Sequence, residues 1–354
     1  MSCKRMIAGA MIGLGAMASS AAAAETIRLT AISGYSPQAS WVQVFREAWV
    51  PEVQRRLAET GNYELEIVEA FGTVVKPRGE LEATQKGIGD IGLVVSVFHA
   101  DKLPLTSVAF VTPFVTTDLT LNARVYDQLT AEFPRMRSNW DDFGMEYLGH
   151  MGTIKSYAVL SRDPIEKIED FTDRKFSGAG LNLTWISGLG ATGVPSAVTK
   201  FYSDVDSGVT DGMIAWPEAI GAYKLCEAAP HLLLADMGAV TSFAVAVNKK
   251  TWGGLPEEVQ TAMRAATPIY RDELAARTSA GHDAGIAECE AQGGTVHHLA
   301  ADERARWAAA LPPIARDWAQ AADKQGFPGT QVLARYMELM REHGQPIARD
   351  WDKE

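Results

Sequence analysis

The motifs that would make this chain an enzyme are weak or missing from its 354 residues. Neither the G-x-S-x-G turn of many hydrolases nor the H-E-x-x-H pattern of zinc proteases occurs. Asp204 and Asp206 could be a carboxylate pair, but two residues apart on a short predicted helix (202–207) they point in different directions. We interpret them as solvated charges, and His297 and His298 as an exposed strand edge. We therefore expect no catalytic residue, cofactor or metal.

One glycine-rich stretch, Gly188-Leu189-Gly190-Ala191-Thr192-Gly193, matches the G-x-G-x-x-G pattern of dinucleotide sites. Such a site needs a strand before the glycines and a helix after them, so that the phosphates meet the helix N-terminus. Here a helix is predicted before them (183–189) and an extended segment after them (194–198). Because the context is inverted, the stretch does not predict nucleotide binding.

Aromatic side chains offer a different chemistry, the binding of a small molecule. Trp41, Trp185, Trp216 and Tyr157 each combine a flat apolar face with one polar atom. Such groups can stack on a planar solute or enclose a cation. Trp41 also lies on the apolar face of a helix predicted over 41–59, so core packing is the alternative for it.

The N-terminus has the pattern of a cleavable secretory signal peptide. Lys4 and Arg5 precede an apolar run over residues 6–17, and small residues follow up to Ala24. The run is shorter than the ~20 residues that span a bilayer, although an uncleaved anchor is the alternative. We predict cleavage near Ala24 and export to the periplasm.

Composition narrows the class of partner. Loss of Lys4 and Arg5 with the leader leaves 31 basic and 44 acidic residues, a net charge of −13. Such a chain repels nucleic acid and anionic membrane surfaces. Only Cys226 and Cys289 then remain, and an oxidising compartment permits a disulfide between them without requiring it.

Strand and helix patterns alternate along the chain, which predicts an α/β protein with largely parallel sheets. Roughly 330 mature residues exceed what one core normally supports, so two domains are expected. No low-complexity linker separates them, which favours several chain crossings and a cleft between the domains. Clefts of this kind are favoured sites for small molecules. The predicted strands cover 25–32, 63–70, 90–97, 145–151, 157–161, 174–177, 194–198 and 240–248, and the main helices cover 41–59, 77–86, 119–131, 256–274 and 301–343.

Short pieces of the chain, in order, resemble the periplasmic solute receptors of TRAP (tripartite ATP-independent periplasmic) transporters. Each piece is weak alone, but the ordered set runs from about Thr26 to Gly326 behind a signal peptide. The pieces are Trp41 in an early helix, RGELEATQKG (78–87) before Asp90-Ile91-Gly92, VTPF (111–114), DPI (163–165) with IEDF (168–171), LGA (189–191), Tyr202 with GVTDG (208–212), and NKK (248–250) with Trp252 and Leu255-Pro256.

This resemblance implies a two-domain periplasmic-binding-protein-like fold with a central cleft and hinge, discontinuous domains and long C-terminal helices. It implies a first domain over 25–151 plus 240–280, a second over 152–239 plus 281–330, and a C-terminal helical extension over 331–354. The domains would close on one solute and deliver it to an integral-membrane permease. A periplasmic sensor subunit is an alternative that the sequence does not separate from transport.

The chain departs from the family pattern at Ser177. Alignment of Asp170-Phe171-Thr172-Asp173-Arg174-Lys175-Phe176 with the family's turn and strand puts Ser177 where an arginine usually binds the solute's carboxylate. A second basic position of the family falls on Ser156, beside Lys155. A hydroxyl supplies neither the charge nor the two-pronged geometry of a guanidinium. The dicarboxylate or sialic-acid specificity of the family therefore does not carry over.

Other residues could take the place of this arginine. Arg78, at the start of a predicted helix, and Lys155 are the candidate cations, with exposed surface charges as the alternative. Glu82 lies one turn after Arg78, and an intrahelical ion pair is the preferred interpretation for it. The candidate solute-binding residues are Trp216, Trp185, Asn182, Arg78, Trp41, Tyr157, Lys155 and Ser177.

These observations predict a TRAP-type receptor for a small organic acid, aromatic or hydroxylated, walled by tryptophans. The alternative solute is neutral or cationic, such as a polyol or a small amine, boxed by tryptophans and Glu82. A hydrolase remains the enzymatic alternative, and turnover of a solute would distinguish it from a receptor.

Overall fold

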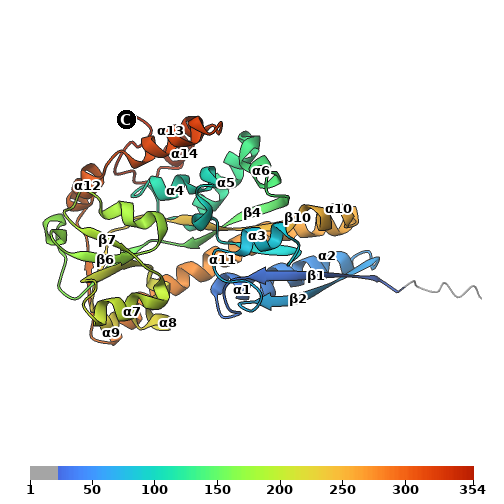
Figure 1. Ribbon diagram of the computed structural model, residues 1–354, viewed down its shortest axis with the longest axis horizontal. Coiled ribbons are helices and arrows are strands. Elements are labelled where there is room, and N and C mark those ends of the chain that lie inside the picture. Colours follow the sequence, from blue (N-terminus) through green and yellow to red (C-terminus); the bar gives the residue numbers. More distant parts are fainter. Residues whose placement is uncertain (1–22) are drawn as a thin grey trace, which may run out of the picture.

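The computed structural model describes residues 23–354, apart from the side chains of residues 241 and 242. Two mixed β-sheets, each covered by helices, lie side by side along the long axis of the molecule (Figure 1). All but the last two residues of the predicted leader, 1–24, lie outside the described residues. None of the helices in the described range combines the length and the apolar character needed to cross a bilayer.

The first sheet has five strands in the order β2-β1-β3-β10-β4. β1 pairs in parallel with β2 and β3, whereas β10 runs antiparallel to β3 and β4. All four residues of β3 are buried, as its continuous apolar run predicts. The strands are β1 (Glu25–Ser33), β2 (Tyr63–Phe71), β3 (Ile91–Val94), β4 (Met145–Ile154) and β10 (Val240–Asn248).

The second sheet has six strands in the order β11-β9-β5-β8-β6-β7. Here β5 is the antiparallel strand, paired with β8 and β9. The predicted edge position of His297 and His298 is confirmed, because β11 pairs with β9 alone. The strands are β5 (Ala158–Ser161), β6 (Lys175–Gly178), β7 (Thr192–Pro195), β8 (Gly212–Ala215), β9 (His231–Leu234) and β11 (Thr295–His298).

The prediction of largely parallel sheets holds for all strands except one in each sheet, β10 in the first and β5 in the second. The chain leaves the first sheet at the end of β4, enters the second as β5, and returns from β9 into β10. A strand that runs toward the junction between the sheets and a strand that comes back from it point in opposite directions. The two crossings, over 155–157 and 235–239, thus impose the antiparallel pairings of β10 and β5.

Helices cover the first sheet much as predicted. The helix expected over 41–59 is continuous but contains a π-helical turn. The strand expected over 90–97 ends at Val94 and continues as a 3-10 helix. The elements are α1 (Ser40–Val44), η1 (Phe45–Trp49), α2 (Val50–Ala58), α3 (Glu80–Gln85), η2 (Ser96–His99), η3 (Pro104–Ser107), α4 (Val108–Val111), α5 (Leu119–Glu132), α6 (Pro134–Asp141) and α10 (Lys249–Gly254).

Local structure in the second sheet differs more from expectation. The helix predicted over 183–189 is a 3-10 helix that begins and ends earlier, η5 (Gly180–Ile186). The strand predicted over 194–198 ends at Pro195, and helix α7 (Val198–Asp206) begins where that strand was expected to end. The remaining short elements are η4 (Ile168–Phe171), η6 (Pro217–Ala219), α8 (Ile220–Tyr223) and α9 (Leu225–Ala228). The glycine-rich stretch 188–193 follows the 3-10 helix η5 and leads into β7, which begins at Thr192 within the stretch, and this confirms the inverted context.

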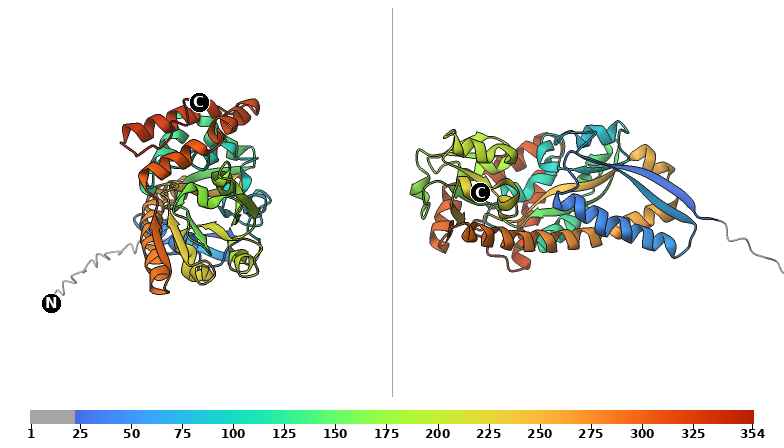
Figure 2. Two further views of the ribbon diagram at one scale, coloured as in Figure 1. Left: turned by 90° about the vertical axis from the view of Figure 1, so that its left-hand side faces the viewer. Right: turned by 90° about the horizontal axis from the view of Figure 1, so that it is seen from below.

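A single helix, α11 (Glu257–Ala291), is the third connection between the two sheets. It has 35 residues and contacts α2 and β4 in the first lobe and η6, α8 and β11 in the second. In the right-hand panel of Figure 2, α11 is the long orange helix that runs along the lower edge of the picture past both lobes. The two strand crossings and α11 together form the hinge of the two-domain fold.

The largest core joins the second sheet to the C-terminal helices α12 (Ala301–Ala310), α13 (Ile314–Lys324) and α14 (Gly329–Glu342). Trp307 and Trp351 are fully buried in it, and Trp351 Nε1 donates to the carbonyl of Pro113 at 2.9 Å. The predicted extension 331–354 is thus packed into this core. The strands follow the predicted division between domains, with β4 running three residues beyond 151, while the exact domain ranges stay a prediction.

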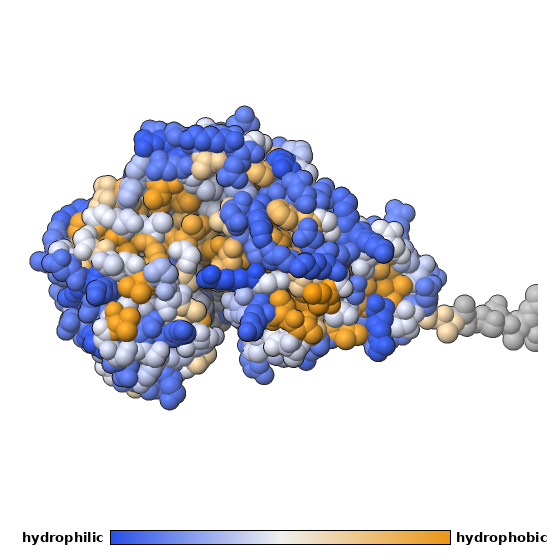
Figure 3. Space-filling view, in the orientation of Figure 1, coloured by the Kyte–Doolittle hydropathy of each residue, from blue (hydrophilic) through white to orange (hydrophobic). Residues whose placement is uncertain are grey.

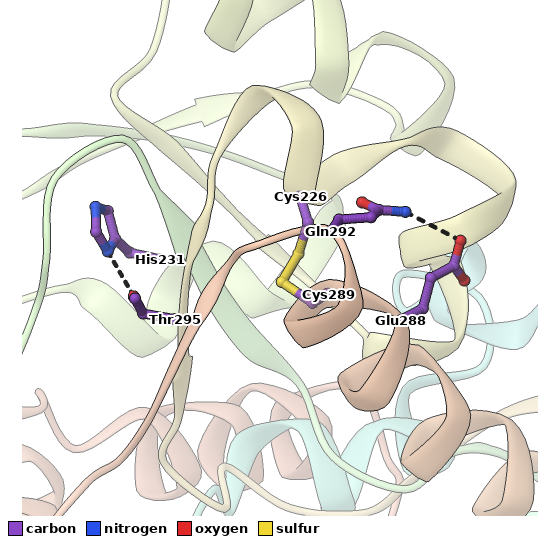
Figure 4. Close-up of a disulfide and its surroundings, with 6 residues drawn as sticks. All are labelled: Cys226, His231, Glu288, Cys289, Gln292 and Thr295. Atoms are coloured by element: carbon purple, nitrogen blue, oxygen red, sulfur yellow. Dashed lines mark hydrogen bonds between the residues drawn. A yellow bond between two sulfur atoms is a disulfide. The ribbon is translucent and has the colours of Figure 1, made fainter.

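Cys226 of α9 and Cys289 of α11 form a disulfide, with their Cα atoms 5.5 Å apart (Figure 4). Sequence alone left this pairing open. The bond fastens the C-terminal end of α11 to the helical layer of the second lobe. The N-terminal half of α11 packs on the first lobe, so the disulfide fixes the hinge helix to one side.

Candidate functional site

A cavity of about 330 Å³ lies between the two lobes and takes its walls from both. Figure 3 shows an indentation at the lower margin of the molecule, in the region of α1 and α8 in Figure 1. One wall is the loop after β1 with the start of α1, the opposite wall is η6 with α8, and α11 spans the two. The lining residues are Tyr35, Ser36, Gln38, Ala39, Ser40, Trp41, Thr153, Trp216, Glu218, Ala219, Ala222, Tyr223, Arg277, Thr278 and Gly281.

Tyr35 and Trp41 form the aromatic wall of the first lobe. Their rings meet edge to face with centroids 4.9 Å apart. Trp41 Nε1 is buried and has no hydrogen-bond partner among the described residues, whereas its carbonyl accepts a bond from Tyr270 at 2.6 Å. This wall therefore contains a buried N–H donor that has no acceptor among the described residues.

The loop that carries Tyr35 is held in place by Glu80 of α3. Glu80 is fully buried, and its Oε1 accepts a hydrogen bond from the backbone N–H of Gly34 at 3.0 Å. A Cβ at Gly34 would lie 2.3 Å from the backbone nitrogen of Pro77, so only glycine permits this approach. Burial raises the pKa of Glu80 to about 7 despite the backbone hydrogen bonds that oppose the rise. Burial, with the nearby Glu80 carboxylate, also raises the pKa of Tyr35.

Trp216 and Glu218 form the wall of the second lobe, directly after β8. Trp216 is half-buried, and its ring packs edge-on against Tyr157 with centroids 6.0 Å apart. The side chain of Glu218 is 14% exposed, and neither of its oxygens has a hydrogen-bond partner among the described residues. This wall therefore combines an aromatic face with a carboxylate that accepts no hydrogen bond from the described residues and has His282 as its ion-pair neighbour.

Two glycines of α11 allow this wall to approach the hinge helix. A Cβ at Gly285 would lie 1.9 Å from the carbonyl oxygen of Pro217, and one at Gly281 would meet the Glu218 side chain at 3.3 Å. His282 lies on the same part of the helix, with Nδ1 3.6 Å from Glu218 Oε2. Thr278, one turn earlier, is buried with no partner for Oγ1 in the described part of the chain.

A family model for bacterial extracellular solute-binding proteins, family 7, matches residues 37–321. The chain belongs to this family. The C4-dicarboxylate-binding periplasmic protein DctP of Rhodobacter capsulatus is 30% identical over 143 residues, which are 38% of this chain and 40% of that protein. The matched region thus spans about two-fifths of that relative.

Solved structures of TRAP solute-binding proteins share the fold of this family member. One from Desulfovibrio salexigens, an open complex, has a TM-score of 0.78 at 18% identity, covering 90% of this chain and 96% of that one. One from Rhodoferax ferrireducens, with copurified benzoate, has a TM-score of 0.77 at 19% identity, covering 90% and 98%. The predicted TRAP resemblance and two-domain α/β fold are confirmed.

The structure brings two of the predicted binding residues, Trp41 and Trp216, to the cavity of this receptor. Tyr157 is buried behind Trp216, and burial raises its pKa. Asn182 is buried near Tyr157, yet neither atom of its amide has a partner in normal hydrogen-bond geometry among residues 23–354. Trp185 is fully buried, donates from Nε1 to the carbonyl of Phe110 at 2.7 Å, and does not line the cavity.

Ser177 is fully buried in the second lobe of the receptor, outside the cavity lining. Its hydroxyl donates to Asp204 Oδ2 at 3.1 Å and lies 3.1 Å from Thr210 Oγ1. Ser196 also donates to Asp204, at 2.5 Å. The expectation that Asp204 is a solvated charge is therefore wrong, because α7 turns its carboxylate inward onto these hydroxyls. Ser177 belongs to this network and not to a cluster that faces a solute.

The candidate cations of the receptor differ in their surroundings. Lys155 Nζ lies 3.0 Å from Asp283 Oδ1 of α11, so its charge is already paired. Arg78 is exposed, has no acidic partner within 4.0 Å among residues 23–354, and stacks its guanidinium 4.5 Å from the Phe98 ring centroid. The predicted Arg78–Glu82 pair is wrong: α3 begins only at Glu80, Arg78 has a φ of 79°, and Glu82 pairs with Lys102 instead.

Sequence reasoning missed several lining residues of the receptor. Neither Tyr35, just after the first predicted strand, nor Glu218, two positions after Trp216, is among the predicted binding residues. Thr278 lines the cavity and His282 lies one turn later, both in the continuation of the long helix predicted to begin over 256–274. A polar stripe on the far half of that helix is the signal that could have found them.

Proposed function

We propose that this protein is the periplasmic receptor of a TRAP-type transporter, capturing a small organic acid between its lobes and delivering it to an integral-membrane permease. The observation that carries the proposal is the cavity with walls from both lobes and a spanning hinge helix. Contacts to both lobes stabilise the closed form, so a solute shifts the population toward closure. The predicted leader, cleaved near Ala24, would direct the protein to the compartment in which such a receptor works.

Support for an acid comes from the family and from Arg78. The name of the Rhodobacter capsulatus relative specifies a C4-dicarboxylate, and the Rhodoferax ferrireducens protein carries benzoate. In this chain Ser177 removes the usual arginine, and Arg78 is the cation beside the cavity without an acidic partner in the described range. Its charge acts on Tyr35, a lining residue, which places it close to the cavity. We assign Arg78 the role of binding the solute's carboxylate.

The test uses the mature chain, residues 25–354, in a thermal-shift screen over small acids, amines and sugars. A ligand that binds only the folded state raises the melting temperature by mass action. We expect aromatic or hydroxylated acids to raise it and Arg78→Ala to reduce the shift. Small-angle scattering should then show a more compact molecule with the acid bound. A scattering profile unchanged at saturation, or chemical conversion of the bound compound, would refute the receptor.

A further inference from the structure

The least expected group in the cavity is the carboxylate of Glu218. Its side chain is 14% exposed, both oxygens are buried, and no described residue donates a hydrogen bond to either. A buried carboxylate that accepts no hydrogen bond has lost the solvation free energy that water would supply. Such a cost persists in a binding site when the missing partner is the ligand.

The cations around Glu218 are bound elsewhere. Arg277, which lines the same cavity, donates to Glu47 at 2.6 Å and to Glu273 at 2.9 Å. Lys155 pairs with Asp283, as described above. His282 Nδ1 lies 3.6 Å from Glu218 Oε2, within ion-pair range but beyond hydrogen-bond distance.

The surroundings of this carboxylate suit a positively charged nitrogen. Trp216, two residues earlier, and the Tyr35–Trp41 pair across the cavity supply aromatic faces. An aromatic face attracts a cation through its quadrupole, most strongly where water is excluded. A carboxylate beside such faces gives the cation a full counter-charge, which a wholly aromatic box lacks.

The first lobe offers the opposite chemistry. Trp41 Nε1 is a buried donor with no acceptor among the described residues. It can bind only an acceptor such as a carboxylate oxygen, because an indole N–H cannot accept a bond. Residues that line one cavity thus supply a donor without an acceptor from one lobe and a carboxylate without a hydrogen-bond donor from the other.

We propose that the solute is a zwitterion, an acid that also carries a cationic nitrogen, with Glu218 and Trp216 holding the nitrogen. This deepens the proposed function and rests on it: the receptor still binds a small acid, and Glu218 selects among acids. A simple monocarboxylate would leave the Glu218 carboxylate without a hydrogen-bond donor and would add a second negative charge to the same cavity.

The test compares zwitterions with carbon isosteres of the same shape that lack the positive charge. Three pairs cover a quaternary nitrogen, a primary amine on an aliphatic chain and a primary amine on an aromatic acid: glycine betaine with 3,3-dimethylbutyrate, 3-aminopropanoate with butyrate, and 4-(aminomethyl)benzoate with 4-ethylbenzoate. Calorimetric titration of the mature chain measures each affinity. In at least one pair we expect the zwitterion to bind roughly tenfold or more tightly, the gain of a charge-assisted hydrogen bond.

Two variants connect this preference to one side chain. Glu218→Gln keeps the shape of the wall and removes its charge, so it should abolish the preference by weakening the binding of the zwitterion and by relieving the repulsion of the isostere's carboxylate. Glu227→Gln removes an exposed carboxylate of the same lobe, one paired with Lys224, and should leave the preference intact. Circular dichroism confirms that both variants are folded.

Three results would overturn the inference: isosteres that bind as well as zwitterions, a preference that survives Glu218→Gln, or no binding of any zwitterion. If the isosteres bind tightly and close the lobes, the zwitterion proposal is refuted but the proposed receptor function is not. If neither arm binds, the zwitterion is refuted, and the broader screen of acids, amines and sugars decides the receptor function by itself.

Discussion

Replacement of Glu80 by glutamine should change the pH dependence of stability within a defined window. Glu80 is fully buried, and burial raises its pKa to about 7 from the 4.5 of a free side chain. A carboxyl with a raised pKa in the folded state binds more protons folded than unfolded between these two values. The free energy of unfolding should therefore fall as pH rises from about 4.5 to 7 and level off above that.

The size of the effect follows from the difference between the two pKa values. That difference is about 2.5, and each unit is worth about 1.36 kcal/mol, so the contribution of Glu80 changes by about 3 kcal/mol across the window. Glutamine keeps an oxygen for the N–H of Gly34 but does not titrate. The Glu80→Gln variant should thus gain about 3 kcal/mol relative to the parent between pH 4.5 and pH 8.

Urea unfolding followed by tryptophan fluorescence at pH 4.5, 5.5, 6.5 and 8 measures this change. Glu82→Gln is the matched control on the same helix. Partial burial is the largest single influence on Glu82 and favours a raised pKa, but the hydrogen bond and charge of Lys102, a backbone hydrogen bond and His99 together outweigh burial and lower the pKa. The control should therefore show no gain between pH 5.5 and 8. Parallel curves for the Glu80 variant and the parent would show that Glu80 is ionised throughout, and the reasoning would fail.

Three further changes separate binding from folding. Trp216→Ala should weaken solute affinity by about 30-fold, which corresponds to the loss of roughly 2 kcal/mol typical of a central aromatic contact. Trp216→Phe should keep most of the affinity. If calorimetry finds the same affinity for Trp216→Ala and the parent, Trp216 is not part of the site. Trp185→Phe loses the bond to the Phe110 carbonyl and should lower stability by about 1–3 kcal/mol with affinity unchanged; altered affinity would place Trp185 at the solute. Replacing both Cys226 and Cys289 by alanine opens a loop with a sequence separation of 63 and should cost about 4 kcal/mol, whereas equal urea midpoints would contradict this.

Much of the fold could be predicted because its signals are local. Alternation of apolar and polar residues located β1, β2 and β10 to within a residue or two. The chain crossings were expected from two α/β halves without a linker. Strand direction in β5 and β10 could not be predicted, because it depends on which end of each sheet faces the other lobe.

The second lobe was harder to predict because its elements are short. η5 and α7 are fixed by tertiary contacts, with Asn182 and Trp185 buried from a single 3-10 segment. The inward turn of Asp204 depends on Ser177, Ser196 and Thr210, which meet only in the folded sheet. Spacing within one helix carries no information about such a network.

Only part of the candidate site could be predicted, because some of its residues are recognised only from contacts made in the folded protein. Trp41 and Trp216 stand out because bulky aromatics are rare and lie in segments that resemble the family's cleft. Glu218 and Thr278 are common residue types, and they become candidates only because their side-chain oxygens lack hydrogen-bond partners among the described residues. A missing hydrogen-bond partner becomes visible only when every neighbour has been placed.

The free polar atoms of the cavity also bear on how closure is driven. Trp41 Nε1 belongs to one lobe and the Glu218 carboxylate to the other, and neither has a hydrogen-bond partner in the described part of the chain. Because the disulfide and the packing of α11 fix Glu218 against the hinge helix, closure must carry the Tyr35–Trp41 wall toward it. A solute that binds only one of these groups favours the open and closed forms almost equally and shifts little population. A solute that satisfies both binds the closed form better by two charge-assisted contacts, so the same groups that select the solute also drive the motion.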